Sequence, residues 1–246
     1  HSFPTTLFRS DESTERRGQL SVNAIFNNKV AVLVGDYLLA TSLVQVSKTR
    51  NHAIIDVVSR LGQDLSEGEL LQLSNVSNLN FSEEVYFNVI RKKTAALFAA
   101  CTKSAALSVG VDSAKVEEAR LLGEYIGLCF QIKDDIFDYF DSKDIGKPTG
   151  NDMLEGKLTL PIIYALNTTK EQWAADLAVK VKRGEASSAE ILTLIQFAKD
   201  RGGIEHAIDR MKDFKESAQR LLERMPESDI KFSLGKYLDY VVERNM

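Results

Sequence analysis

Proline is scarce in this chain of 246 residues, occurring only at positions 4, 148, 161 and 226. The tracts 5–147 and 162–225 therefore contain no residue that breaks a helix from within. Glycine adds only 14 turn-forming residues, too few for the frequent turns of a β-sandwich or barrel. This scarcity predicts an all-α fold, and the length predicts a single domain over residues 1–246.

The chain also has few cysteines and a small net charge. The two cysteines, Cys101 and Cys129, exclude a disulfide framework, and each lies in an apolar stretch, which predicts buried free thiols in a reducing cytoplasm. The 31 basic and 35 acidic residues give a net charge of −4. We therefore expect no nucleic-acid partner, because such proteins carry an overall basic footprint.

Long apolar runs are missing from the sequence. The longest, at 31–34 and at 95–111 with its interruption by Lys103, fall short of the ~20 residues that span a bilayer. We therefore expect no membrane span, and the first residues show no signal-peptide pattern.

Hydrophobic periodicity predicts helices along most of the chain. Apolar residues are dense from about 21 to about 60, which predicts central, mostly buried helices. Ser82 followed by two glutamates is typical of a helix start, and that helix should run to about Val109. We expect the other helices at about 113–140, 158–167, 171–183, 187–201, 202–224 and 227–243.

A cluster of carboxylates follows the apolar stretch that ends near residue 137. It comprises Asp134, Asp135, Asp138, Asp141 and Asp144. At ~100° per residue, 134, 138 and 141 share one helical stripe, and like charges spaced in this way destabilise a helix. A divalent cation that prefers oxygen ligands would offset this repulsion, and Mg²⁺ suits a few carboxylates completed by water and phosphate oxygens.

A second interpretation of the same cluster is a solvated helix end, balanced by Lys133, Lys143 and Lys147. The glycine-rich segment after it carries Lys147 and Lys157, and this favours a metal–phosphate site over the solvated end. An EF-hand is excluded, because the alternate acidic positions and central glycine of its loop are absent.

Several ordered motifs resemble those of the trans-type polyprenyl diphosphate synthases. Residues 131–138, QIKDDIFD, resemble the second aspartate-rich motif of that family, FQxxDDxxD. The segments GKP at 146–148 and EGKLTLP at 155–161 resemble the loop and helix start that follow it. Further matches are GDYLLA at 35–40, GQ at 62–63 with Glu67, and KTAxLF at 93–98. The resemblance runs from Asp11 onward and implies a bundle of long antiparallel helices around a central cavity.

The resemblance implies an enzyme that condenses an allylic diphosphate with isopentenyl diphosphate, using Mg²⁺ to neutralise the leaving diphosphate. It implies metal ligation by Asp134, and by Asp135 and Asp138 directly or through water, with Asp11 at the last position of the first motif. The residues implied to bind the diphosphates are Arg16, Arg17, Lys93, Thr94, Gln131, Lys147 and Lys157, where the lysines serve as point charges. The resemblance also implies that Asp134, Lys93 and Lys147 are catalytic residues.

The chain departs from the family pattern at its start. Residues 7–11 read LFRSD, so the two leading aspartates of the first motif are absent, as is the family's N-terminal section. This keeps open an alternative in which the chain is an inactive or truncated relative that pairs with an active synthase. A terpene cyclase and a helical bundle without a ligand are weaker alternatives. The family is usually dimeric, which implies a homodimer through helices within 21–110.

Overall fold

The computed structural model describes residues 15–16, 19–76, 81–140 and 149–244. The chain divides into two compact units, residues 1–58 and 59–246. Nearly all described residues with regular structure are helical, which confirms the all-α prediction. The expectation of a single domain stays a prediction.

The first unit holds a small hairpin and two helices. Strands β1 (Glu15–Arg16) and β2 (Gln19–Leu20) pair antiparallel, and α1 (Val22–Ile25) precedes α2 (Asn28–Ser47). The Asn27 side chain caps α2 by accepting a hydrogen bond from the Val30 N–H at 3.0 Å. A third helix, α3 (His52–Val76), begins in this unit and continues into the second.

Helix α2 is apolar, yet most of its residues are exposed within the chain. None of its residues is buried, nor is any residue of α1. The prediction of mostly buried helices is therefore wrong for this segment. By length and composition alone α2 could cross a membrane, so the estimate that every apolar stretch is too short needs correction, while the expectation of no membrane span stays a prediction.

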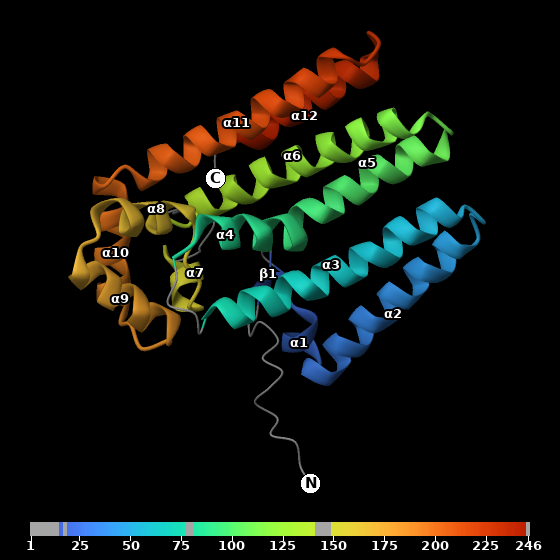
Figure 1. Cartoon of the computed structure of the whole chain (residues 1–246). Helices are drawn as coiled ribbons and strands as arrows, with labels where there is room; N and C mark the ends of the chain where they lie inside the picture. The colour runs from blue at the N-terminus through green and yellow to red at the C-terminus, as the bar shows by residue number, and fades with distance from the viewer. Residues whose placement is uncertain (1–14, 17–18, 77–80, 141–148, 245–246) are drawn as a thin grey trace. The chain divides into compact units, whose positions relative to one another are not determined.

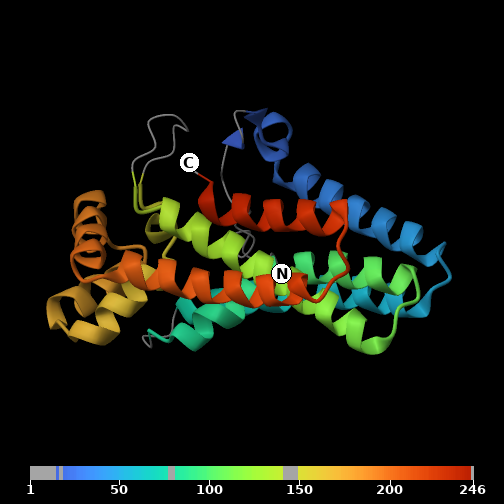
Figure 2. The same ribbon diagram turned by 90° about the horizontal axis from the view of Figure 1, so that it is seen from above.

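The second unit is built around one long helix, α6 (Ser113–Phe137). The chain runs through α4 (Glu83–Ile90), a π-helical turn η2 (Arg91–Ala95) and α5 (Ala96–Ser108) before it reaches α6. Helices α5, α11 (Gly203–Glu223) and α12 (Asp229–Glu243) all pack along α6; Figure 1 and Figure 2 show the four running side by side. Leu128, Cys129 and Ile132 of α6 have no exposed surface and form the centre of the core.

Four shorter helices complete this unit: α7 (Asn151–Leu154), α8 (Leu160–Thr169), α9 (Gln172–Lys182) and α10 (Ser188–Asp200). Ser187 and Glu190 form a reciprocal capping box at the start of α10. Pro161 lies in the first turn of α8, where a missing N–H costs no helical hydrogen bond. The expected helices after residue 158 are thus confirmed, with bounds within a few residues.

Two expectations for this unit need correction. Helix α6 ends at Phe137 rather than near residue 140, and Asp138 is its C-cap. Cys129 is buried as expected, but Cys101 is exposed, since an apolar stretch alone does not fix which of its residues face the core. Both thiols are free.

Candidate functional site

A cavity of about 140 Å³ lies in the second unit, between the C-terminal part of α3 and the helices around α6. It gathers side chains from five segments that are far apart in the sequence. The cavity is lined by Gln72, Asn75, Tyr86, Val89, Ile90, Lys93, Thr94, Gln131, Asp135, Asp152, Gly156, Lys157, Leu158, Thr159 and Lys182.

Five of the residues that the sequence singled out meet at this cavity: Lys93, Thr94, Gln131, Asp135 and Lys157. Asp134 and Asp138 lie on the same end of α6 but do not line it. The sites expected at Asp11, Arg17 and Lys147 lie outside the described residues. The backbone of Arg16 lies in β1, opposite Gln19, in the other unit.

The π-helical turn η2 carries Lys93 and Thr94 to the cavity wall. Single π turns inside α-helices often occur at functional sites, because they change the direction of the side chains. Lys93 forms an ion pair with Glu69 and donates a hydrogen bond to Gln72, both on α3. The Thr94 hydroxyl donates to Oε1 of Gln131 at 2.6 Å.

The turn packs unusually closely against α6. A Cβ atom added to Gly127 would lie 2.6 Å from the Cα of Ala95, and one added to Gly123 would lie 2.4 Å from the Phe98 carbonyl oxygen. Only glycine permits this approach of one backbone to another. These two glycines of α6 thus allow the end of η2 and the start of α5 to pack directly on α6.

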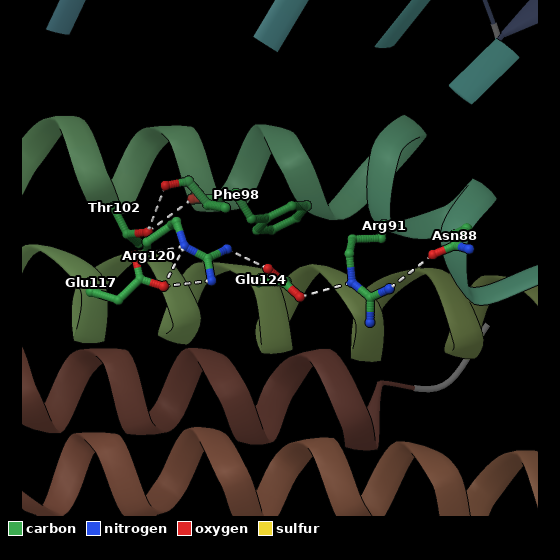
Figure 3. A network of polar contacts seen from close by, with 8 residues as sticks. Asn88, Arg91, Phe98, Thr102, Glu117, Arg120 and Glu124 are labelled. Atoms are coloured by element: carbon green, nitrogen blue, oxygen red, sulfur yellow. Dashed lines mark hydrogen bonds and ion pairs between the residues drawn. The ribbon is translucent and has the colours of Figure 1, made fainter. Parts of the chain in front are cut away.

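A ladder of ion pairs fixes the outer side of the same turn (Figure 3). The Arg91 guanidinium donates to Glu124 of α6 at 2.9 Å and to the Asn88 side chain at 3.3 Å. Glu124 also accepts from Arg120, which in turn pairs with Glu117. These carboxylates raise the pKa of Arg120. The first residue of η2 is therefore tied to the helix that carries the aspartates.

Asp135 is the innermost of the three aspartates. It is 4% exposed, and both of its carboxylate oxygens accept hydrogen bonds: Oδ2 from the Tyr86 hydroxyl at 2.6 Å and Oδ1 from Nε2 of Gln131 at 2.7 Å. Burial, and then the charge of Asp152, raise the pKa of Asp135 well above its ordinary value.

Asp134 points to the other side of α6, where its side chain is 41% exposed. Its Oδ1 forms an ion pair with Arg244, which follows the last residue of α12. The Arg244 guanidinium also donates to the Phe130 carbonyl oxygen at 3.0 Å and lies 4.2 Å from the centre of the Phe130 ring. The end of the described chain is thereby attached to a partly exposed carboxylate of the cluster.

Asp138 differs from Asp134 and Asp135, because its carboxylate binds the backbone at the start of α7. Its two carboxylate oxygens accept from the backbone N–H groups of Asn151 at 2.9 Å and Asp152 at 3.1 Å. Gly150, in the left-handed region at φ 83°, turns the backbone so that these N–H groups face the carboxylate. Asp138 therefore positions the segment that leads to Lys157.

The donors around this end of α6 fit a magnesium ion that binds with its substrate. Among the described residues, no three His, Cys, Asp or Glu side chains converge as a closed metal site. Magnesium typically takes only one or two carboxylates and fills its octahedron with water and phosphate oxygens. Asp134 and Asp138, one helical turn apart, could provide such a partial set.

The cavity also holds a lysine that sequence reasoning missed. Lys182 is 5% exposed, and its Nζ donates to the backbone oxygen of Asn75 at 2.9 Å and lies 5.4 Å from the centre of the Phe81 ring. Burial lowers its pKa. One signal was present: Lys182 shares the apolar stripe of its helix with Ala174, Ala178 and Val181. A lysine on a buried stripe warrants attention, because burial of its charge is costly.

The lining of this cavity suits an anion with several oxygens. Three lysines, at 93, 157 and 182, line the cavity together with Asp135 and Asp152. Lys157 also pairs with Glu155 at the rim. Compact ammonium groups beside amide and hydroxyl donors are typical of phosphate recognition.

Comparisons with known proteins agree with this chemistry. Residues 10–197 match the family model described as polyprenyl synthetase. The chain is 34% identical to octaprenyl diphosphate synthase of Haemophilus influenzae over 238 residues, which cover 96% of this chain and 71% of that protein. The curated relatives are covered over 53% to 73% of their length.

Solved structures are similar as well. The crystal structure of geranylgeranyl pyrophosphate synthase from Bacteroides thetaiotaomicron is 67% identical, with a TM-score of 0.86 over 91% of this chain and 74% of that one. That of a decaprenyl diphosphate synthase from Rhodobacter capsulatus is 34% identical, with a TM-score of 0.88 over 95% and 72%.

Proposed function

Because the chain belongs to the polyprenyl synthetase family, we propose that it joins an allylic diphosphate to isopentenyl diphosphate and so makes a polyprenyl diphosphate. The observation that carries this proposal is the convergence of Lys93, Thr94, Gln131 and Lys157 on one cavity beside Asp134 and Asp138. The alternative of an inactive partner subunit is less well supported, because a pure scaffold has no need for that set of residues.

The proposed reaction begins when the bond between the allylic carbon and a diphosphate oxygen breaks, and the diphosphate leaves with the electron pair. The double bond of isopentenyl diphosphate then attacks the carbocation, and loss of a proton creates the new double bond. Diphosphate leaves readily only when its negative charge is neutralised. Lys93 and Lys157 would provide positive charge there without acting as bases, and Gln131 would donate an N–H to a phosphate oxygen.

Magnesium is the cofactor we propose. Asp134 would be its principal ligand, because its carboxylate is 41% exposed and lies at the end of α6, and Asp138 would bind directly or through water. When bound, magnesium would neutralise the leaving diphosphate. Asp11, Arg16, Arg17 and Lys147 remain predicted members of the site.

Two measurements on the full chain test the proposal. Calorimetry with inorganic pyrophosphate and Mg²⁺ should detect binding that EDTA abolishes, and incubation of labelled isopentenyl diphosphate with an allylic diphosphate should give a longer prenyl product. Lys157→Met should weaken pyrophosphate binding at least tenfold. Lys212→Met is the control, because Lys212 is an exposed lysine of α11 that pairs only locally with Asp209. Equal binding by the wild type and the Lys157 variant would contradict the proposed site.

We further propose that α2 pairs with a second copy of the chain. A helix that is apolar on all sides normally lies in a core, yet no residue of α2 is buried here. Light scattering at micromolar concentration should give twice the 27.4 kDa chain mass. Leu38→Asp, on the exposed surface of α2, should give the monomer, whereas the helix-neutral change Gln45→Glu should not. A monomeric wild type that floats with liposomes would refute the dimer in favour of a membrane contact.

The compartment stays a prediction. The curated relatives include proteins named as mitochondrial and chloroplastic as well as bacterial ones, so family membership alone does not settle the expected cytoplasmic location.

A further inference from the structure

A chain of hydrogen bonds leads from the core to the cavity wall. The buried Tyr86 hydroxyl of α4 donates to Oδ2 of Asp135 at 2.6 Å. Nε2 of Gln131 donates to the other oxygen of that carboxylate at 2.7 Å, and the Thr94 hydroxyl donates to Oε1 of Gln131 at 2.6 Å. Four residues from three helical segments are thus linked in series, and all four line the cavity.

The direction of the Gln131 amide follows from this chain. Amide oxygen and nitrogen are nearly the same shape, so only their partners decide which way the group points. The Asp135 carboxylate is an acceptor when ionised, and an amide oxygen turned toward it would be repelled. The NH₂ group therefore faces Asp135, and among the described residues no acceptor takes its second N–H.

Asp135 is itself held in place by Tyr86. The tyrosine is 6% exposed and packs edge-on against Phe87 with ring centres 5.2 Å apart, so its hydroxyl has little freedom to move. A hydrogen bond to a charged acceptor in a buried place is stronger than one in water. With both oxygens engaged, Asp135 fixes two donors rather than presenting an open oxygen to a metal.

We infer that Tyr86 is a positioning residue that acts through Asp135 to hold the Gln131 amide with an N–H directed at the anion in the cavity. This inference rests on the proposed diphosphate site and deepens it. It assigns Asp135 a role distinct from those of Asp134 and Asp138: orientation of a substrate donor instead of metal ligation.

Calorimetry with inorganic pyrophosphate at fixed Mg²⁺, on the full chain, tests this inference. Tyr86→Phe should weaken binding about tenfold, because the carboxylate loses one of its two donors and the amide is free to turn over. Asp135→Asn should weaken it at least as much, and its side chain keeps the shape of aspartate. Tyr240→Phe, on the exposed surface of α12, should bind like the wild type.

A double-mutant cycle separates positioning from a general structural effect. If Tyr86 acts through Gln131, Tyr86→Phe should have no further effect on pyrophosphate binding once Gln131→Leu is present. Binding of Mn²⁺ measured without pyrophosphate should be unchanged in Tyr86→Phe, since Asp134 and Asp138 are untouched. Thermal unfolding of each variant shows that it is folded.

The outcomes distinguish the two proposals. If Lys157→Met binds pyrophosphate as tightly as the wild type, the proposed diphosphate site itself is wrong. If Lys157→Met is impaired while Gln131→Leu or Tyr86→Phe binds normally, the site stands and the inference about Tyr86 is wrong. Independent, multiplicative effects of the two changes, or weaker Mn²⁺ binding by Tyr86→Phe, would also overturn the inference.

Discussion

Replacement of Arg244 by glutamine should destabilise the protein, although the residue lies almost at the end of the chain. The guanidinium contacts α6 through the ion pair with Asp134, the hydrogen bond to the Phe130 carbonyl oxygen and its approach to the rings of Phe130 and Phe137. The side chain is 16% exposed, so these contacts are largely shielded from water.

The expected magnitude follows from these contacts. The contact with the rings is worth about 1 kcal/mol. The ion pair with a 41% exposed carboxylate is worth about 0.5 kcal/mol, and the hydrogen bond to the carbonyl about 1 kcal/mol. Against this, Nε of Arg244 is buried without a hydrogen-bond partner among the described residues, which costs about 1 kcal/mol. The net loss in Arg244→Gln is therefore about 1.5 kcal/mol, or roughly 3–6 °C in a chain of this size.

Urea and thermal unfolding of three proteins test this estimate. Arg224→Gln is the matched control, because Arg224 is 64% exposed and makes a single ion pair with Glu118, so its loss should stay within about 0.5 kcal/mol. A loss in Arg244→Gln no larger than that of the control would refute the reasoning. Removal of this positive charge should also tighten Mg²⁺ binding several-fold, provided that Asp134 is a metal ligand.

Two further predictions concern packing and reactivity. In urea unfolding, Gly127→Ala should lower the free energy of unfolding by about 1–3 kcal/mol, because its new Cβ would meet the Ala95 backbone. Gly35→Ala on α2 is the control: its new Cβ would meet nothing within 4 Å, so it should be neutral or stabilising. Burial raises the pKa of Cys129 to about 12, so a disulfide reagent at pH 8 should titrate only Cys101 in the native protein and both thiols in urea. Two reactive thiols in the native state would contradict the burial of Cys129, and full stability of Gly127→Ala would contradict the close packing.

The sequence allowed much of the fold to be predicted, because the helices of the second unit have strong periodic patterns and clear starts, such as the Ser82 cap and the Ser187 capping box. It also indicated five residues of the cavity. Burial was less predictable: α2 has the composition of a core helix, but whether such a helix is covered depends on tertiary or quaternary contacts that composition does not encode.

The different tasks of the three aspartates could not be derived from their spacing. The partners of Asp134 and Asp135 come from Arg244 and Tyr86, which are 110 and 49 residues away in the chain. Asp138 stays a predicted metal ligand, but its carboxylate also accepts from the first N–H groups of a four-residue helix that no periodic pattern could reveal. Long-range packing decides which carboxylates remain open to solvent.

The π-helical turn at Arg91–Ala95 has a consequence for how this segment tolerates changes in length. A π turn holds one more residue than an α-helical turn, so it amounts to a single-residue insertion absorbed within a helix. Deletion of one residue there would let α4 and α5 join as a regular α-helix, with the residues on either side of the turn keeping their faces. The change would fall on the turn itself, so Lys93 and Thr94 would lose the bulge that carries them to the cavity wall while Tyr86 kept its place.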